Sequence, residues 1–325
     1  MTEYDPIPLE EIKAANVRIK DTIIRTPLIK LGLDDAPAEI YLKLENLQPT
    51  GAFKIRGSLN ALKSLKPEEY ENGVYAYSSG NHGQGLAFSA KQLGIKCTIW
   101  TTDEASPMKV EAMKRLGAEI RTFSYPKTPE EWLTSFDQMH EEMSGLNISG
   151  TLTSVMAGYG TIGLEILEDL PDVDAILMPV GGGANLCGVG SVINAMKPNV
   201  KIYGCEIETA TPLTAGLEAG EMVDVDVTSS FINAIGYPMM MPRLWGIASQ
   251  VATGTIVVSL KEVCDSVRLL VERNKIVSEG AGAVSVAAAL SGKAGKGKVV
   301  CVVTGGNIDT EKLVTILNGN IPTTH

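Results

Sequence analysis

The chain has 325 residues, of which 44% are hydrophobic and 5% aromatic, and its formal net charge at pH 7 is −10. This length suggests about two globular domains, and the negative charge argues against nucleic acid or an anionic membrane as the main binding partner. The opening "MTEYDPIPLEEIK" is acidic, and no apolar run reaches membrane-spanning length. We therefore expect no signal peptide, no membrane segment and a cytoplasmic protein.

From Pro8 onward the spacing of apolar residues predicts an amphipathic helix. Glu10 and Glu11 fall in its first turn, near the positive end of the helix dipole. The apolar face is expected to contain Leu9, Ile12, Ala15, Val17 and Ile19.

Strand-like and helix-like segments alternate along the rest of the chain. A β-like segment begins at Tyr41 and breaks at residues 49–51, where "GAFKIRGS" begins. Further strands are expected at residues 73–79, 96–101, 119–125, 175–180, 201–207 and 298–304, and helices at 83–94 and 106–117. Ser106 stands at the N-cap of the last helix and Pro107 at its first position. The alternation predicts an α/β fold in which parallel sheets are covered on both faces.

The cysteines and histidines give little sign of metal or disulfide chemistry. The five cysteines are widely spaced, odd in number and without a CxxC pair: Cys97, Cys187, Cys205, Cys264 and Cys301. We expect reduced, buried thiols. Of the three histidines only His82 lies in a suggestive context, so no metal site is predicted.

Four turns of small residues lie where a ligand would bind in a parallel α/β fold, beyond strand ends or at the start of a helix. They are "SSGNHG" (78–83), "GGG" (181–183), "SEGAGA" (278–283) and "TGGN" (304–307). Each could be a plain connection, but three successive glycines are costly unless the backbone closes on a phosphate. The turns match neither GxxxxGK[ST] nor GxGxxG, which favours a phosphate monoester over a nucleotide. With Lys54, they predict a cleft that binds a phosphorylated aromatic cofactor covalently.

The motifs "TGAFKIRG", "SSGNHGQG", "PVGGGAN", "SEGAGA" and "TGGN", in this order, closely resemble the pyridoxal-phosphate enzymes of the tryptophan-synthase β fold, known as fold type II. Within that fold the chain is most similar to serine/threonine dehydratases and serine racemases, over almost its whole length. The resemblance implies two parallel-sheet α/β domains with a cofactor cleft between them. The small domain would comprise residues 53–150, and the large domain residues 1–52 and 151–325 with the phosphate loop. It also implies a homodimer.

The resemblance further implies roles for residues around the cofactor, pyridoxal 5'-phosphate. Lys54 would bind it covalently and later remove the α-proton of the substrate. Phe53 would pack beside the cofactor ring, or serve only in the core, and Asn81 would bond the ring hydroxyl. Thr304 would face the pyridine nitrogen, where the family has a serine. Glu279 would lie near cofactor and substrate, or cap a helix.

Two further segments match binding motifs of the family. The phosphate loop would consist of Gly181, Gly182, Gly183 and Ala184, with Ala184 where the family usually has a fourth glycine. The substrate carboxylate would be bound by Ser78, Ser79, Gly80, Asn81 and His82. Ser79 also stands where racemases have a second acid/base serine, so a racemase stays open as the alternative.

The chain departs from the family pattern at three places. Racemase-like members bind a cation through two acids six residues apart, but here Pro212 follows Glu206 at that distance. The segment "SYPKTPEEWL" has Trp132 and no arginine, which disfavours a substrate with a β-carboxylate. The segment "GYPMMMPRLWG" could be core or could line an apolar pocket, which tilts the prediction towards an apolar β-substituent.

The reaction that these residues imply is β-elimination. A β-hydroxy-α-amino acid, resembling threonine or serine or the bulkier phenylserine, would yield a 2-oxo acid and ammonia. Cysteine synthases are less similar, since they usually read FKDR and GNTG where this chain has "FKIRG" and "GNHG". A cofactor carrier without catalysis is the remaining alternative.

Overall fold

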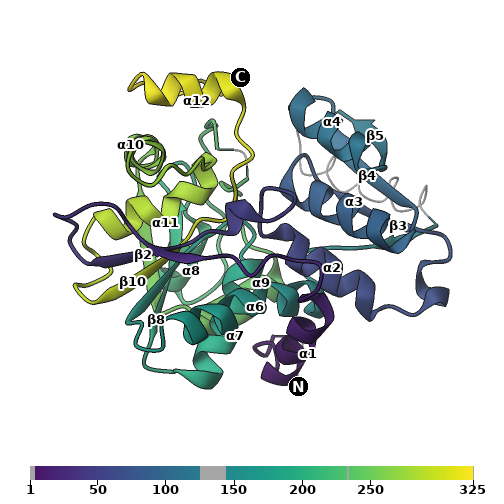
Figure 1. Cartoon of the computed structure of the whole chain (residues 1–325), viewed down its shortest axis with the longest axis horizontal. Helices are drawn as coiled ribbons and strands as arrows, with labels where there is room; N and C mark the ends of the chain where they lie inside the picture. The colour runs from purple at the N-terminus through teal and green to yellow at the C-terminus, as the bar shows by residue number, and fades with distance from the viewer. Residues whose placement is uncertain (1–3, 125–143, 233, 325) are drawn as a thin grey trace.

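The computed structural model describes residues 4–124, 144–232 and 234–324, and it has two α/β lobes, each built on its own sheet (Figure 1). The larger sheet has the strand order β1-β2-β10-β7-β8-β9. Its strands are β1 (Leu28–Lys30), β2 (Glu39–Lys43), β7 (Ala175–Pro179), β8 (Lys201–Ile207), β9 (Gly254–Val258) and β10 (Lys298–Val302). Only β1 pairs in the antiparallel direction.

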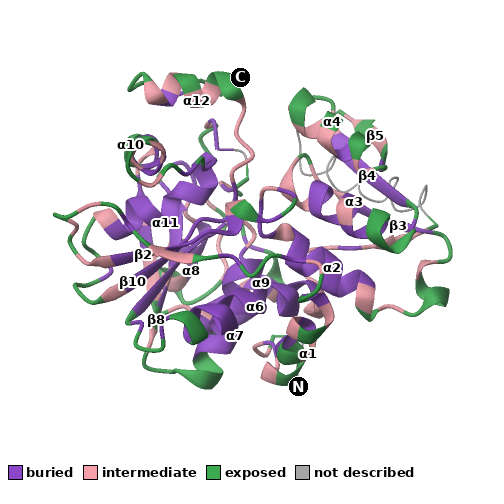
Figure 2. Cartoon of the chain, in the orientation of Figure 1, coloured by how far each residue is buried: buried purple, intermediate pink, exposed green. Residues whose placement is uncertain are grey.

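The larger sheet is covered by helices on both faces, as Figure 2 shows. Along β7, Ile176 and Met178 belong to one core cluster, and Ala175 and Leu177 to the other. Alternate residues of a strand point to opposite faces, so a strand buried on both sides must be apolar throughout. The first cluster draws on α1 (Leu9–Ile19), α6 (Thr153–Asp169), α7 (Ala184–Met196) and α9 (Pro242–Val251), and the second on α10 (Leu260–Leu269) and α11 (Gly280–Leu290).

The smaller sheet is parallel throughout, with the order β5-β4-β3-β6. Its strands are β3 (Val74–Tyr77), β4 (Cys97–Thr102), β5 (Glu119–Phe123) and β6 (Leu146–Asn147), and its helices include α3 (Asn81–Leu93) and α4 (Pro107–Arg115). The parallel α/β fold predicted from the sequence is confirmed. The domain bounds at residues 53 and 150 stay a prediction.

Helix α2 (Lys54–Ser64) lies between the lobes and packs closely on a helix of each. On one side Gly158 of α6 approaches the carbonyl oxygen of Arg56 so closely that a Cβ at Gly158 would collide with it. On the other side a Cβ at Gly85 of α3 would lie 3.0 Å from the carbonyl carbon of Lys54. Glycines thus let both neighbouring helices approach the first turn of α2.

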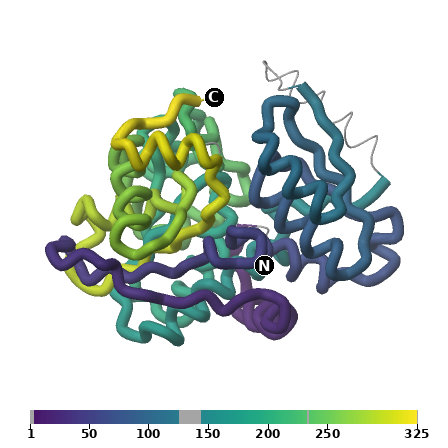
Figure 3. Tube along the Cα trace, turned by 45° about the horizontal axis from the view of Figure 1, so that its top comes forward, coloured from purple at the N-terminus to yellow at the C-terminus, as the bar shows by residue number. Residues whose placement is uncertain are grey.

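The remaining elements are short or terminal. They are the 3-10 helices η1 (Glu45–Leu47) and η2 (Pro67–Tyr70), the π-helical turn η3 (Leu270–Asn274), and the helices α8 (Pro212–Ala219) and α12 (Thr310–Leu317). Residues from the two ends of the chain lie side by side in the larger lobe, where β2 pairs with β10 (Figure 3). No helix in the described ranges is long and apolar enough to span a bilayer.

Several predictions of detail were wrong. The segment from Tyr41 leaves the sheet after Lys43 and continues into η1, well before Pro49. Val17 is 64% exposed and does not belong to the buried face of α1.

Other predictions of detail agree with the structure or fall outside it. All five cysteines are buried and free, as expected. Ser106 is the N-cap residue of α4 and Pro107 its first residue, as predicted, although the Ser106 hydroxyl accepts no capping bond and instead donates to Asp309 Oδ1 at 2.8 Å. Trp132 and Tyr125, which entered the predictions, lie outside the described residues.

Candidate active site

Lys54 is fixed next to the carboxyl end of β10 by backbone pairing of the two flanking turns. Ala52 forms an antiparallel bridge with Gly305. The amide of Phe53 donates to the carbonyl of Thr304 at 3.0 Å, and the amide of Gly306 donates to the carbonyl of Gly51 at 2.9 Å. The turns "GAFK" and "TGGN", some 250 residues apart, therefore form one structure.

The amine of Lys54 lies in a mostly apolar environment. Lys54 is half-buried, and its Nζ is 4.7 Å from the ring centroid of Phe53 and 5.5 Å from that of Tyr159. Burial lowers the pKa of Lys54 to about 8, although the negative charge of Glu279 acts in the opposite direction. A neutral amine is the nucleophile in Schiff-base chemistry, so this environment favours the reactive form near neutral pH.

Asn81, Glu279 and Asn307 form a hydrogen-bonded row beside this site. Asn81 Nδ2 donates to Oε1 of Glu279 at 2.6 Å, and Asn307 Nδ2 donates to Oδ1 of Asn81 at 2.8 Å. Burial raises the pKa of Glu279. Glu279 occupies the N-cap position of α11, but its side chain makes no capping bond there and instead accepts from Asn81.

The turn after β3 presents free amides at the start of α3. The hydroxyl of Ser78 accepts hydrogen bonds from the amides of Gly83, at 2.9 Å, and Gly80, at 3.2 Å. The amides of Asn81 and His82 are the first two of the helix and have no intrahelical acceptor, so they can bind an anion. The exposed Ser79 hydroxyl lies 3.1 Å from Thr101 Oγ1 and 3.3 Å from Thr102 Oγ1.

The ring of His82 is held in one tautomer by a backbone carbonyl. Its Nε2 lies 2.7 Å from the carbonyl oxygen of Ile148 and must carry the proton, because a carbonyl only accepts. Nδ1 is buried, and no partner for it is found in the described chain. Burial, together with the nearby Lys54, lowers the pKa of His82 to about 4, so the ring is neutral at physiological pH.

The glycine loop between β7 and α7 has the geometry of a phosphate cradle. Gly183 has φ +93°, and a Cβ there would lie 2.5 Å from Met240 Cε. A Cβ at Gly181 would lie 2.8 Å from the carbonyl oxygen of Ala234. Neither position accepts a side chain, and the first amides of α7 are directed out of the helix end. Ala184 already has negative φ as the first residue of α7, so its methyl group is tolerated.

These residues fit pyridoxal phosphate. The loop at residues 181–184 could hold its phosphate, and Lys54 could supply the amine that binds it. Thr304 is 5% exposed and belongs to the turn that is paired with Phe53. Of the predicted residues, the structure joins Phe53, Lys54 and Thr304 in one group and Asn81 with Glu279 in another.

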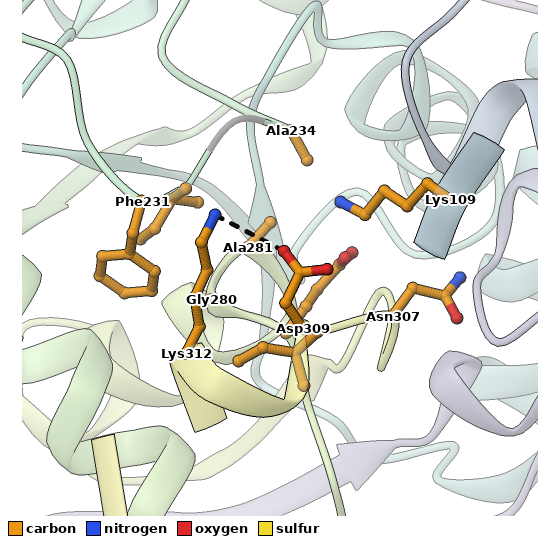
Figure 4. Close-up of a pocket in the computed structure, with 11 residues that line it drawn as sticks. Lys109, Phe231, Ala234, Gly280, Ala281, Asn307, Asp309 and Lys312 are labelled. Atoms are coloured by element: carbon orange, nitrogen blue, oxygen red, sulfur yellow. Dashed lines mark ion pairs between the residues drawn. The ribbon is translucent and has the colours of Figure 1, made fainter. Parts of the chain in front are cut away.

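A pocket opens beside this row, between the lobes (Figure 4). Lys109 of α4 and Lys312 of α12 extend into it from opposite sides, and Glu279 and Asn307 also line it. Lys312 pairs with Asp309 at 3.6 Å. The pocket therefore borders the row at Glu279 and Asn307.

The sequence analysis missed a buried ionic network under α2. Arg56 is fully buried and binds Glu45 through Nε at 2.8 Å and Glu165 through NH1 at 2.7 Å. Lys43, equally buried, contacts Glu165 at 2.6 Å. The sequence does contain one indication of this network, because Lys43 and Glu45 are charged residues within the apolar segment "YLKLEN". Their partner on α6, Glu165, is more than 100 residues away from Arg56 and could not be identified from the sequence.

Glu206, where the family's cation site was doubtful, has a structural role instead. Its carboxylate accepts hydrogen bonds from the amides of Leu213 and Thr214 at 2.9 and 2.8 Å, and from the Thr214 hydroxyl at 2.6 Å. Glu206 therefore caps the start of α8. In the described part of the chain no three acidic, histidine or cysteine side chains group as metal ligands.

Comparison with known proteins identifies the family. The profile of the family described as "Pyridoxal-phosphate dependent enzyme" matches residues 19–305. The chain belongs to this family. The predicted resemblance, the fold type and the cofactor are thereby confirmed.

Relatives of this pyridoxal-phosphate-dependent enzyme include threonine-degrading lyases. It is 37% identical to the L-threonine ammonia-lyase of Thermotoga maritima, over 96% of this chain and 78% of the relative. It is 33% identical to a putative threonine dehydratase of Sinorhizobium fredii, over 100% of this chain and 99% of the relative. The structure of maize serine racemase superposes with a TM-score of 0.88 at 28% identity and covers 97% of each chain.

Proposed function

We propose that this enzyme dehydrates and deaminates a β-hydroxy-α-amino acid, with threonine as the first candidate, to a 2-oxo acid and ammonia. The observation that carries the proposal is the half-buried Lys54 amine, which the pairing of Ala52 with Gly305 and of Phe53 with Thr304 holds at the carboxyl end of β10, and whose pKa burial lowers to about 8. Relatives named threonine ammonia-lyase and threonine dehydratase support the same reaction class.

Binding is divided between the lobes. The loop Gly181–Ala184 and the start of α7 would hold the cofactor phosphate, and Asn81 would donate to the cofactor ring hydroxyl or accept from it. Phe53 would pack beside the ring. The substrate carboxylate would be bound by the amides of Asn81 and His82, at the start of α3, and by the hydroxyls of Ser78 and Ser79. The bound cofactor supplies an electron sink for the carbanion at Cα of the substrate.

Lys54 performs the proton transfer at Cα. As a free amine, Lys54 would take the α-proton of the bound substrate. The Cβ–O bond then breaks, and the hydroxyl group leaves as water after gaining a proton. Water later hydrolyses the unsaturated amine, which gives the 2-oxo acid and ammonia, so one water is lost and one is consumed. With its neutral hydroxyl, Thr304 would leave the ring nitrogen of a bound cofactor without an ion pair, which would favour elimination over transamination.

A serine racemase is the second candidate. Similarity to maize serine racemase, together with Ser79, favours it. A racemase needs a second acid/base on the face of Cα opposite Lys54. The hydroxyl of Ser79 lies within bonding distance of Thr101 and Thr102, so it would have to turn before it could exchange a proton with Cα.

The substrate side chain is the least constrained part of the proposal. In the segment proposed as an apolar pocket, Met240 is buried against Gly183, whereas Met239 and Met241 are 40% and 55% exposed. Met240 thus shapes the phosphate loop. A substrate as large as phenylserine must make its apolar contacts elsewhere.

We further propose a cytoplasmic homodimer, and light scattering of the purified protein tests its mass.

The test is a substrate panel of serine, threonine, phenylserine and hydroxyaspartate, assayed for 2-oxo-acid release and for D-isomer. We expect oxo acid from threonine and little from hydroxyaspartate. Lys54→Ala should abolish turnover and the visible absorbance of the lysine-bound cofactor. Lys63→Ala, on the same helix, should keep both, because Lys63 contacts Arg18 and Thr22. D-isomer without oxo acid would establish the racemase, and an active Lys54→Ala variant would contradict the mechanism.

A further inference from the structure

Two aromatic rings from different helices flank the Lys54 amine. Phe53 precedes α2, and Tyr159 lies in α6. Their centroids are 4.7 Å apart with the ring planes at 60°. Lys54 Nζ is 4.7 Å from the centroid of Phe53 and 5.5 Å from that of Tyr159. Both distances are within the range at which a cation is attracted to an aromatic face.

Tyr159 reaches this position because α2 carries a glycine opposite it. A Cβ at Gly57 would lie 2.5 Å from Tyr159 Cε1 and 2.8 Å from Cζ, so any side chain there would displace the ring. Tyr159 is fully buried, and its hydroxyl has no hydrogen-bond partner in the described part of the chain. Burial raises the pKa of Tyr159, so the phenol stays neutral and cannot act as a base at working pH.

Few charges stabilise the Lys54 ammonium. Glu279, the residue before α11, is the carboxylate that acts on Lys54, and it already accepts a hydrogen bond from Asn81. His82 from α3 is neutral, since its Nε2 proton is fixed by Ile148 and burial opposes protonation of Nδ1. A lysine that must hold a proton during turnover needs another source of stabilisation at this point.

We propose that Tyr159 is a positioning residue that forms, with Phe53, an aromatic box around the Lys54 ammonium and stabilises it by cation–π attraction. The box lets a buried lysine keep the proton taken from Cα without a strong ion pair to fix its position. The inference rests on the proposed function in one respect, namely that Lys54 is the reactive amine.

The test titrates Lys54 in the full-length chain from which the cofactor has been resolved. Cyanate carbamylates neutral amines, so the rate of Lys54 modification against pH, read by peptide mass spectrometry, gives its pKa. Tyr159→Met removes the aromatic face but keeps an apolar side chain, and the pKa of Lys54 should fall by about 1. Tyr159→Phe removes only the unpartnered hydroxyl and should leave this pKa unchanged. Lys63 serves as the internal reference.

A second variant guards against misfolding. Phe53→Leu removes the nearer ring and should lower the pKa of Lys54 in the same direction. In the holoenzyme, kcat should fall at low pH as Lys54 becomes protonated. The pH at which this fall occurs should be lower in Tyr159→Met than in the wild type and unchanged in Tyr159→Phe. An unchanged Lys54 pKa in both ring-deleted variants overturns the inference, and so does an equal fall in Tyr159→Phe. Because carbamylation needs no turnover, a protein inactive on every substrate would defeat the proposed function while leaving this test valid.

Discussion

Asn81 Nδ2 lies 2.6 Å from Oε1 of Glu279, and this hydrogen bond joins the two lobes at the point where cofactor and substrate are proposed to meet. The two residues are 198 positions apart in the sequence. A Cβ at Gly305 would collide with the same carboxylate oxygen, so the turn at Gly305 is shaped around Glu279. The pair gives the cleft a defined polar wall.

The first prediction concerns this pair. Asn81→Ala should destabilise the protein by about 1–3 kcal/mol, because it leaves a buried carboxylate without its donor. In a Glu279→Gln background the same change should cost less, since an amide is cheaper to leave unpaired than a carboxylate. Urea unfolding of the four proteins in this double-mutant cycle measures the difference. Strictly additive effects would show that the two side chains are not coupled.

The second prediction concerns the phosphate cradle. Gly183→Ala should cost about 1–2 kcal/mol from positive φ alone, and its methyl group would also meet Met240 Cε at 2.5 Å. We expect cofactor affinity to fall at least tenfold, as measured by the visible absorbance during cofactor titration.

Gly182→Ala is the matched control. Its Cβ would lie 3.7 Å from Leu244 Cδ1, an ordinary contact, and its φ is not positive. It should fold as the wild type does. Equal loss of cofactor affinity in the two variants would mean that backbone conformation is not the determining factor.

The third prediction concerns the ionic network beneath α2. Arg56→Met leaves Glu45 and Glu165 buried with only Lys43 as a cation, so we expect a loss of about 3–5 kcal/mol in the free energy of unfolding. Arg268→Met is the control. Arg268 pairs with Glu272 on the surface at a side-chain exposure of 47%, and its loss should cost less than about 1 kcal/mol. Denaturant titration compares the two, and similar losses would argue against the network as an anchor of α2.

The fourth prediction concerns pH. The pKa of His82 is about 4 in the folded protein against 6.5 as its ordinary value, since burial disfavours the charged ring. As pH falls from 6.5 to 4, the unfolded chain takes up a proton that the folded chain refuses, so stability is lost over this window. His82→Asn should flatten the dependence there. Urea unfolding at several pH values tests it, and an identical slope in the variant would show that other groups cause the loss.

The sequence alone determined the fold class and the order of the motifs along the chain, and the resemblance of those motifs to a known family identified the cofactor. The fold class and the phosphate loop can be predicted from short segments of the sequence. Near-continuous apolar strands predict a parallel sheet, and three glycines at a strand end indicate a backbone that closes on an anion. The segments around Lys54, Gly183 and Asn81 could each be located from composition and spacing. Locating them did not require knowledge of the residues that contact them in the fold.

Only the tertiary structure decided what surrounds each of these residues. Glu279 could be read as a helix cap until its carboxylate was seen to accept from Asn81. Arg56 gave no sign of being a buried anchor, because its partners come from η1 and α6. Tyr159 could not be placed beside Lys54, since that contact depends on how α6 crosses α2 at Gly57. These contacts depend on how segments far apart in the sequence pack together. The spacing of residues within one segment therefore does not predict them.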